Sequence, residues 1–205
     1  MVAVVFGSGL GLFNGSQNIL GGRGTWGQGV LGQAGNRLSV NAANGNLVLQ
    51  ARDEQLSGRG LDLLHLRTYN AKGAWNDGDG DGWRWDAERT VVFIGNGKRI
   101  GESGTKVVRT GGDGHQTEYT WDTSRQRYVS TDGDGAHDTL VYEEGPRQWV
   151  WVDGSSRQEE RYTGSTGRLA SQKDSSGNVI GYGYDGSGRL HQITDLGSGQ
   201  KLVLT

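Results

Sequence analysis

The chain of 205 residues lacks cysteine and has no long hydrophobic run. The absence of cysteine excludes a disulfide framework and any metal site with thiolate ligands. The apolar stretch of residues 1–6 has no basic flank and ends at Gly7, which is too short for a signal peptide or a membrane span. We therefore expect no membrane span, and a signal for export is not visible in this chain.

Aliphatic side chains are also scarce. Hydrophobic residues make up 33% of the chain, whereas glycine alone contributes 38 residues. Glycine is unfavourable inside helices and favoured where the backbone takes a positive φ, so the chain should turn often. Disorder is the alternative for so glycine-rich a sequence, but seven Trp and seven Tyr residues can supply buried area. The composition favours an ordered, turn-rich β protein.

No single sign of charge dominates, because 21 basic and 23 acidic residues are mixed along the chain. A basic stripe that could follow a phosphate backbone is absent, so we expect no nucleic-acid partner. The glycine patterns at residues 22–27 and 27–32 fit a dinucleotide fingerprint but neither follow a strand nor open a helix. The four histidines are dispersed and show no metal-ligand spacing. Glu159 and Glu160 are adjacent, so they should face opposite sides of a strand and cannot act as a pair of catalytic carboxylates. We predict no enzyme activity.

From Leu38 onward, short β-prone runs alternate with turn dipeptides such as Asn96-Gly97 and Asp185-Gly186. Asn-Gly and Asp-Gly favour tight hairpin turns, and no window shows a sustained helical period. The only proline, Pro146, leaves the strands free to donate backbone hydrogen bonds. Residues 1–36 are interpreted as a glycine-rich N-terminal strap, ordered only by packing on the body that follows.

The C-terminal half repeats. Gly167-Arg168-Leu169 recurs 21 residues later as Gly188-Arg189-Leu190, and tyrosines follow at spacings of 20 and 22, as a one-residue bulge would produce. Four aspartates stand 21 residues apart: Asp132, Asp153, Asp174 and Asp195. A unit of this length holds two strands and two turns, so each repeat is one hairpin that cannot bury its face alone. The sequence predicts an all-β fold in which antiparallel hairpin repeats of about 21 residues form a curved sheet.

The repeat has a recognisable pattern. Tyr184-Asp185-Gly186-Ser187-Gly188-Arg189-Leu190, followed by Asp195, Gly197 and Gly199, resembles the YD repeat of RHS proteins. The preceding unit has Thr163 where that pattern has Asp. Upstream, Asn44-Gly45-Asn46-Leu47, residues 60–70 and Gly82-Trp83-Arg84-Trp85 resemble the segment that opens many RHS cores. We assign residues 37–110 to the opening segment and residues 111–205 to YD-type hairpin repeats.

The resemblance implies a function. In RHS toxins, Tc-toxin cocoon subunits and teneurins, the hairpins wind into a spiralling sheet that closes as a hollow shell, which in bacterial members commonly encloses a C-terminal toxin. It implies a secreted or cell-surface bacterial protein. Its partners would be the remainder of the shell or further copies of the chain, and an enclosed toxin domain. With three or four repeats and neither a self-cleavage motif nor a toxin domain, the chain is expected to be the start of a shell.

The tryptophans leave a second function open. Trp83 and Trp85 alternate along one strand, as do Trp149 and Trp151, so each pair shares a strand face. An exposed pair would suit a surface adhesion or carbohydrate-recognition module, with or without calcium. We expect a core role for these residues, since a chain with few aliphatic side chains must bury its aromatic ones.

One acidic segment suggests a cofactor. Its spacing matches the twelve-residue calcium loop, with Gly82 at the bend and five candidate ligands: Asp77, Asp79, Asp81, the backbone carbonyl of Trp83, and Glu88. No flanking helices are predicted, and Arg84 stands where such loops have an aliphatic residue. Calcium is thus the one candidate cofactor, and a solvated acidic turn between strands is the alternative.

Overall fold

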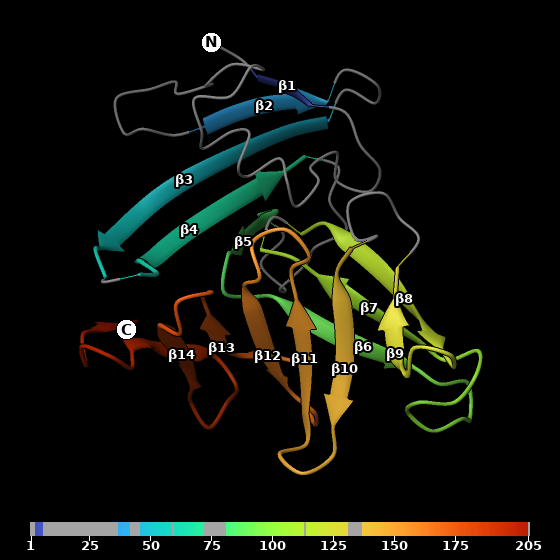
Figure 1. The fold of residues 1–205 in the computed structure, drawn as a ribbon. Coiled ribbons are helices and arrows are strands. Elements are labelled where there is room, and N and C mark those ends of the chain that lie inside the picture. Colours follow the sequence, from blue (N-terminus) through green and yellow to red (C-terminus); the bar gives the residue numbers. More distant parts are fainter. Residues whose placement is uncertain are drawn as a thin grey trace. The chain divides into compact units, whose positions relative to one another are not determined.

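The computed structural model describes residues 3–5, 37–41, 46–58, 60–71, 81–112, 114–130 and 137–204. These residues form strands and turns and contain no helix, which confirms the all-β prediction (Figure 1). Accordingly, the described part of the chain holds no helix that could cross a membrane. The chain divides into two compact units, residues 1–54, 64–88 and 110–116 in one and residues 55–63, 89–109 and 117–205 in the other.

The first sheet has five strands in chain order: β1 (Ala3–Val5), β2 (Arg37–Asn41), β3 (Asn46–Leu56), β4 (Leu63–Asn70) and β5 (Trp83–Trp85). β1 pairs with β2 in parallel, whereas β2 with β3 and β4 with β5 are antiparallel. Apart from β1, the expected N-terminal strap of residues 1–36 lies outside the described residues.

The second sheet has eleven strands, each beside its neighbour in the chain. They are β6 (Thr90–Ile94), β7 (Lys106–Thr110), β8 (Gln116–Asp122), β9 (Arg127–Val129), β10 (Thr139–Glu143), β11 (Gln148–Val152), β12 (Glu159–Thr163), β13 (Leu169–Lys173), β14 (Val179–Tyr184), β15 (Leu190–Asp195) and β16 (Lys201–Val203). The pairings from β8 to β16 are antiparallel. β11, β13 and β15 begin 21 residues apart, at 148, 169 and 190, as the repeat predicts.

The second sheet contains the bulges that the tyrosine spacing predicts. The register of β12 with β13 shifts between Arg161 and Tyr162, and that of β14 with β15 shifts between Gly183 and Tyr184. In both places the extra residue follows the leucine of a Gly-Arg-Leu motif. Such bulges increase the local twist of a strand pair, so each repeat adds curvature at the same position.

The second sheet curls until its first strand reaches its eighth. Thr90 at the start of β6 forms a bridge with Arg168, and the Val91 amide donates to the Gly167 carbonyl at 2.8 Å. Every strand from β6 to β13 sends at least one buried side chain into the curl: Val91, Val107, Tyr119, Tyr128, Leu140, Trp149, Trp151, Tyr162 and Leu169. Trp149 and Trp151 are 2% and 3% exposed, so they are core residues as expected. The core role expected for Trp83 and Trp85 is wrong, because both side chains of β5 are only half-buried. The interior of the curl is filled, and aromatic rings do most of the filling.

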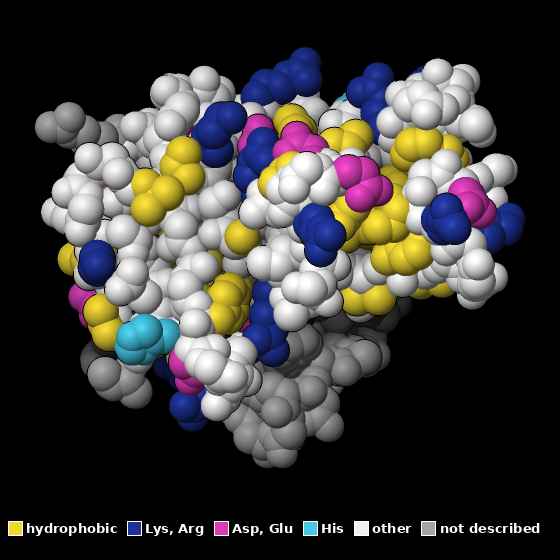
Figure 2. Space-filling view, turned by 90° about the horizontal axis from the view of Figure 1, so that it is seen from below, with side chains coloured by type: hydrophobic (Ala, Val, Ile, Leu, Met, Phe, Trp, Pro, Cys, Tyr) yellow, Lys and Arg dark blue, Asp and Glu magenta, His cyan; other side chains and the backbone are white. Residues whose placement is uncertain are grey.

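A smaller core lies beside the later strands. Leu63, Ile180 and Ile193 are buried there, and residues 55–63 supply two more side chains, Leu56 and Leu61. The segment that joins β3 to β4 thus covers part of β14 and β15. On the face shown in Figure 2, hydrophobic groups alternate with Lys, Arg, Asp and Glu side chains of both signs, as the even mixture of charges in the sequence predicts.

Candidate functional site: the hairpin turns and a buried ion cluster

Five turns of the second sheet begin with an aspartate whose side chain caps the turn. The Oδ1 atom of each aspartate accepts a hydrogen bond from the backbone amide two residues later, at 2.7–2.9 Å. A short carboxylate suits this role because it reaches the turn amides without leaving its own backbone. The capping residues are Asp122, Asp153, Asp174, Asp185 and Asp195.

The caps alternate between the two ends of the hairpins. At one end an aromatic residue precedes the turn, as in Trp121-Asp122, Tyr142-Glu143, Tyr162-Thr163 and Tyr184-Asp185. At the other end stand Asp153, Asp174 and Asp195, which the 21-residue spacing identified; Asp132 lies outside the described residues. Each YD unit therefore supplies two turns. Tyr142 belongs to the tyrosine spacing that the sequence shows, whereas the pair at residues 121–122 is an earlier copy of the Tyr-Asp position that sequence analysis missed.

Each turn closes with a residue in the left-handed region, three or four positions after its first residue. In the C-terminal repeats this residue is glycine, with φ between 67° and 89°: Gly167, Gly177, Gly188 and Gly199. In the three earlier turns it is Gln126, Arg147 or Arg157, with φ between 51° and 61°. The same turn is therefore built without glycine upstream, which explains why the Gly-Arg-Leu pattern fades there although the hairpins continue.

The arginine and leucine of Gly-Arg-Leu link neighbouring repeats. Leu169 is fully buried in the curl. The Nη1 atom of Arg168 donates to the Gly188 carbonyl, and its guanidinium lies 5.6 Å from the centre of the Tyr184 ring. A Cβ at Gly188 would lie 2.1 Å from that Nη1 atom. Gly188 is thus required both for its positive φ and for the approach of the preceding repeat's arginine.

A buried ion cluster crosses the interior of the curl. Glu160 of β12 is fully buried, and its Oε2 atom accepts hydrogen bonds from Arg109 of β7 at 2.6 and 3.0 Å. Its Oε1 atom accepts from Arg89 and, at 3.2 Å, from Gln172 of β13. The Tyr162 hydroxyl also donates to this carboxylate. One carboxylate therefore fastens three strands and the residue just before β6.

The electrostatics keep this cluster ionised near neutral pH. Burial opposes ionisation of Glu160, but the charges of Arg109 and Arg89 prevail and lower the pKa of its carboxyl to about 2. Burial likewise opposes the charge of Arg109, yet Glu160 raises the pKa of that guanidinium above its ordinary value. The guanidinium lies 3.6 Å from the centre of the Trp151 ring, which adds a cation–π contact. A pair that stays charged near neutral pH does not exchange protons, so its role here is to hold strands together.

Glu159 and Glu160 face opposite sides of β12, as strand geometry predicts. Glu159 lies outside the curl and pairs with Arg161 at 2.6 Å and with Lys173 at 3.2 Å. Sequence analysis identified the two glutamates but missed the role of Glu160. Its partner Arg109 is 51 residues away, and no local pattern connects them.

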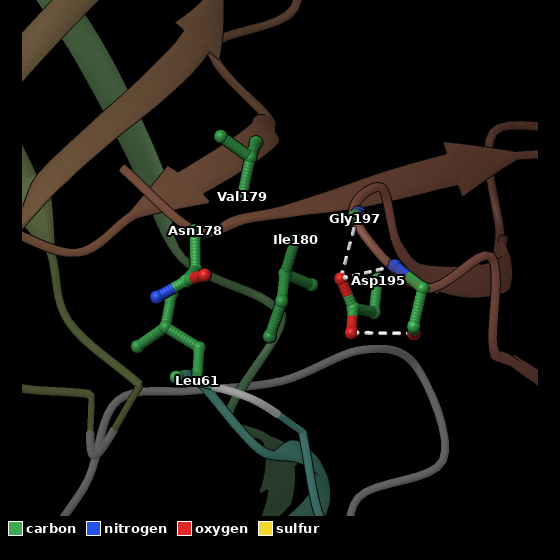
Figure 3. A pocket seen from close by; sticks show the side chains of 8 residues that line it. Leu61, Asn178, Val179, Ile180, Asp195 and Gly197 are labelled. Carbon is green, nitrogen blue, oxygen red and sulfur yellow. Dashed lines mark hydrogen bonds between the residues drawn. The ribbon is translucent and has the colours of Figure 1, made fainter. Parts of the chain in front are cut away.

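A small pocket opens beside the last turns. Its volume is about 120 Å³, and it is lined by Gly60, Leu61, Asn178, Val179, Ile180, Asp195, Gly197 and Ser198 (Figure 3). The Asp195 carboxylate already accepts from the Gly197 amide at 2.8 Å and the Ser198 hydroxyl at 2.6 Å. Ligand pockets typically measure about 300–1,000 Å³, so this space is too small for a cargo or an organic substrate.

The candidate calcium ligands fall partly outside the described residues, which exclude Asp77 and Asp79. The Asp81 Oδ1 atom accepts a hydrogen bond from the Trp83 amide at 2.7 Å, and Trp83 begins β5. The Glu88 Oε2 atom accepts from the Trp85 amide at 2.8 Å. The described residues contain no cluster of three or more His, Asp or Glu side chains that could hold a metal ion. Calcium binding stays a prediction.

These observations define a repeat protein in which capped hairpins add one after another to a single curled sheet. Residues 165–200 match the family model described as RHS Repeat, and residues 38–119 match a domain of unknown function, DUF6531. The chain belongs to the RHS/YD-repeat family, as the motif of residues 184–190 predicts. A comparison with curated proteins found no match. RHS repeats are structural rather than catalytic, and RHS-repeat proteins are generally extracellular or cell-surface proteins.

Proposed function

We propose that this chain is a structural segment of a secreted RHS-type shell that encapsulates or delivers a toxin domain, and that it is not an enzyme. The observation that carries the proposal is the growth pattern of the second sheet. Strands β8 to β16 add strictly in chain order through antiparallel pairings, and five of the turns between them have the same aspartate cap. A sheet that is extended by one repeated hairpin unit can be extended by further units of the same kind until it surrounds a large space.

The filled interior of the curl indicates that this chain is a segment of a shell and does not itself enclose a cargo. The space inside the curl is occupied by the buried side chains of β6 to β13 and by the Arg109–Glu160 cluster. A cargo therefore needs room that further strands supply. We assign to this chain a segment of the shell wall, whose hairpins set the curvature of the sheet.

Electron microscopy and limited proteolysis of the full-length gene product that carries these residues test the proposal. We expect a closed hollow particle whose wall contains the hairpins described here, and an enclosed domain that resists protease until the particle is denatured. An open sheet with no enclosed domain would refute the encapsulating role.

A further inference from the structure

One face of β4 and β5 carries a strip of aromatic and charged side chains, here called the β4–β5 strip. Alternation along the two strands separates it from the buried side of the sheet, where Thr68 and Arg84 are 0% and 3% exposed. The strip residues are all at least partly exposed. They are His65, Arg67 and Tyr69 of β4, Trp83 and Trp85 of β5, and Asp53 of β3.

The rings of the strip are held in fixed orientations by one another. Trp83 lies opposite Tyr69 in the ladder, with ring centres 5.6 Å apart and planes inclined at 51°. Trp85 meets His65 edge to face, with ring centres 4.5 Å apart and an angle of 82°. Side chains that are both partly exposed and positioned in this way lose little conformational entropy when a ligand packs on them.

A polar pair lies between the aromatic residues. The Nη2 atom of Arg67 donates to the Asp53 Oδ1 atom at 2.7 Å, and its Nε donates to Oδ2, so the pair is bidentate. The Arg67 guanidinium also lies 5.2 Å from the centre of the Trp83 ring. Arg67 and Asp53 are 40% and 30% exposed, which leaves a donor and an acceptor side by side and open to solvent.

The strip is electrically neutral. The hydrogen bond from Arg67 holds the pKa of Asp53 below its ordinary value, so the carboxylate is charged and balances the guanidinium. Burial lowers the pKa of His65, whose Nδ1 atom lies 3.2 Å from Asp53, so the imidazole is neutral at pH 7. An anionic ligand would have to compete with Asp53 for Arg67. A purely apolar ligand would leave the exposed ion pair unsolvated.

We propose that the β4–β5 strip is a binding site for a neutral glycan. The C–H face of a pyranose ring packs on the indoles of Trp83 and Trp85, as apolar groups pack on aromatic faces. Adjacent hydroxyl groups, each both a donor and an acceptor, bridge to Arg67 and Asp53. Small-ligand sites combine such apolar surface with a few placed polar groups. This activity is independent of the shell role and would give the protein a means of contacting a glycan-coated surface.

Titration of the chain with neutral hexasaccharides, followed by calorimetry and tryptophan fluorescence, tests the site. The probes are β-1,4-linked glucose, β-1,4-linked N-acetylglucosamine and α-1,4-linked glucose, with a sulfated hexasaccharide for comparison. We expect saturable binding of at least one neutral probe, weakened tenfold or more in Trp83→Ala and Trp85→Ala. Arg67→Lys keeps the charge but loses the bidentate geometry and should weaken binding several-fold. Val92→Ala, at a side chain 54% exposed on β6, is the control and should bind as the parent does.

Three results would overturn the proposal. One is failure of all neutral probes to bind at millimolar concentration. Another is tighter binding of the sulfated probe than of the neutral ones. The third is unchanged affinity in a folded Trp83→Ala variant. If that variant does not fold, Arg67→Lys and Asp53→Asn decide, because unchanged affinity in both also refutes the site. A dimer in sedimentation that Trp85→Ala dissociates would assign the strip to a second copy of the chain instead.

Discussion

Replacing Glu160 by glutamine tests whether the ion cluster holds the curl together. The side chain keeps its volume but loses the charge that balances Arg109 and Arg89, of which Arg109 is 2% exposed. Breaking a buried pair by removing one partner costs about 3–5 kcal/mol, because the remaining charge is left uncompensated. The lowered pKa of Glu160 gives a similar figure, since a fall from 4.5 to about 2 corresponds to about 3 kcal/mol at neutral pH.

The pH dependence gives a second and independent readout. Because the pKa of Glu160 is lowered in the folded state, its stabilisation is fully present above pH 4.5 and is lost as the pH falls towards about 2. Asp122, Asp153, Asp174 and Asp185, whose pKa values are also lowered, lose their contribution at acid pH in both proteins. Only the parent also loses the Glu160 contribution. Its stability should therefore fall more steeply between pH 5 and pH 2 than that of the variant.

Urea denaturation followed by circular dichroism, repeated from pH 7 to pH 2, measures both effects. We expect Glu160→Gln to lower the free energy of unfolding by about 3 kcal/mol at pH 7. In a thermal scan this corresponds to a melting temperature lower by roughly 6–12 °C, since 1 kcal/mol corresponds to about 2–4 °C for a chain of this size. The matched control is Glu118→Gln, which removes an ion pair with Lys106 in which both side chains are more than 40% exposed. Such a pair is worth about 0–1 kcal/mol. Equal stabilities of parent and Glu160→Gln at pH 7, or parallel pH profiles, would refute the reasoning.

Three further predictions concern the turns and the acidic segment. Gly188→Ala should lower the free energy of unfolding by more than about 1 kcal/mol, because φ is +80° and a Cβ would contact Arg168. Gly145→Ala, which has open space, should change it little in the same urea titration. Gln126→Gly should raise it by about 0.5–1 kcal/mol, because glycine relieves a φ of 51°; a loss of stability would show that Gln126 is unstrained. Millimolar calcium should raise the melting temperature of the parent but not of Asp79→Ala, and a folded parent indifferent to calcium would end that hypothesis.

The C-terminal hairpins could be predicted from sequence because their turns contain glycine. Gly167 and Gly188 supply the left-handed turn residue, so spacing and residue type agree there. Gln126 and Arg147 adopt the same conformation at some cost, and no sequence rule identifies them as turn residues. The Gly-Arg-Leu pattern was therefore visible only where glycine closes the turn, although the sheet itself extends back to β6.

The residues of the candidate sites could likewise be predicted only where their role depends on local sequence. The burial of Trp149 and Trp151 followed from alternation and composition, both of which are local properties. The partners of Glu160 could not be predicted, because the curl that brings Arg109 beside it results from twist summed over several strands. The β4–β5 strip could be predicted in part. The alternation of Trp83 and Trp85 was visible, but the Arg67–Asp53 pair depends on the register of three strands.

The contact between the first strand of the curl and its eighth also sets an order of events during synthesis. Arg168 follows Thr90 by 78 residues, which at 5–20 residues per second take roughly 4–16 s to emerge from a ribosome. Hairpins such as β8–β9 can form within microseconds of emerging. The inner face that carries Tyr119, Tyr128 and Arg109 nevertheless stays open until β12 and β13 arrive. For those seconds the nascent chain exposes aromatic surface and an unbalanced guanidinium, which makes this interval the stage at which a chaperone has most to protect.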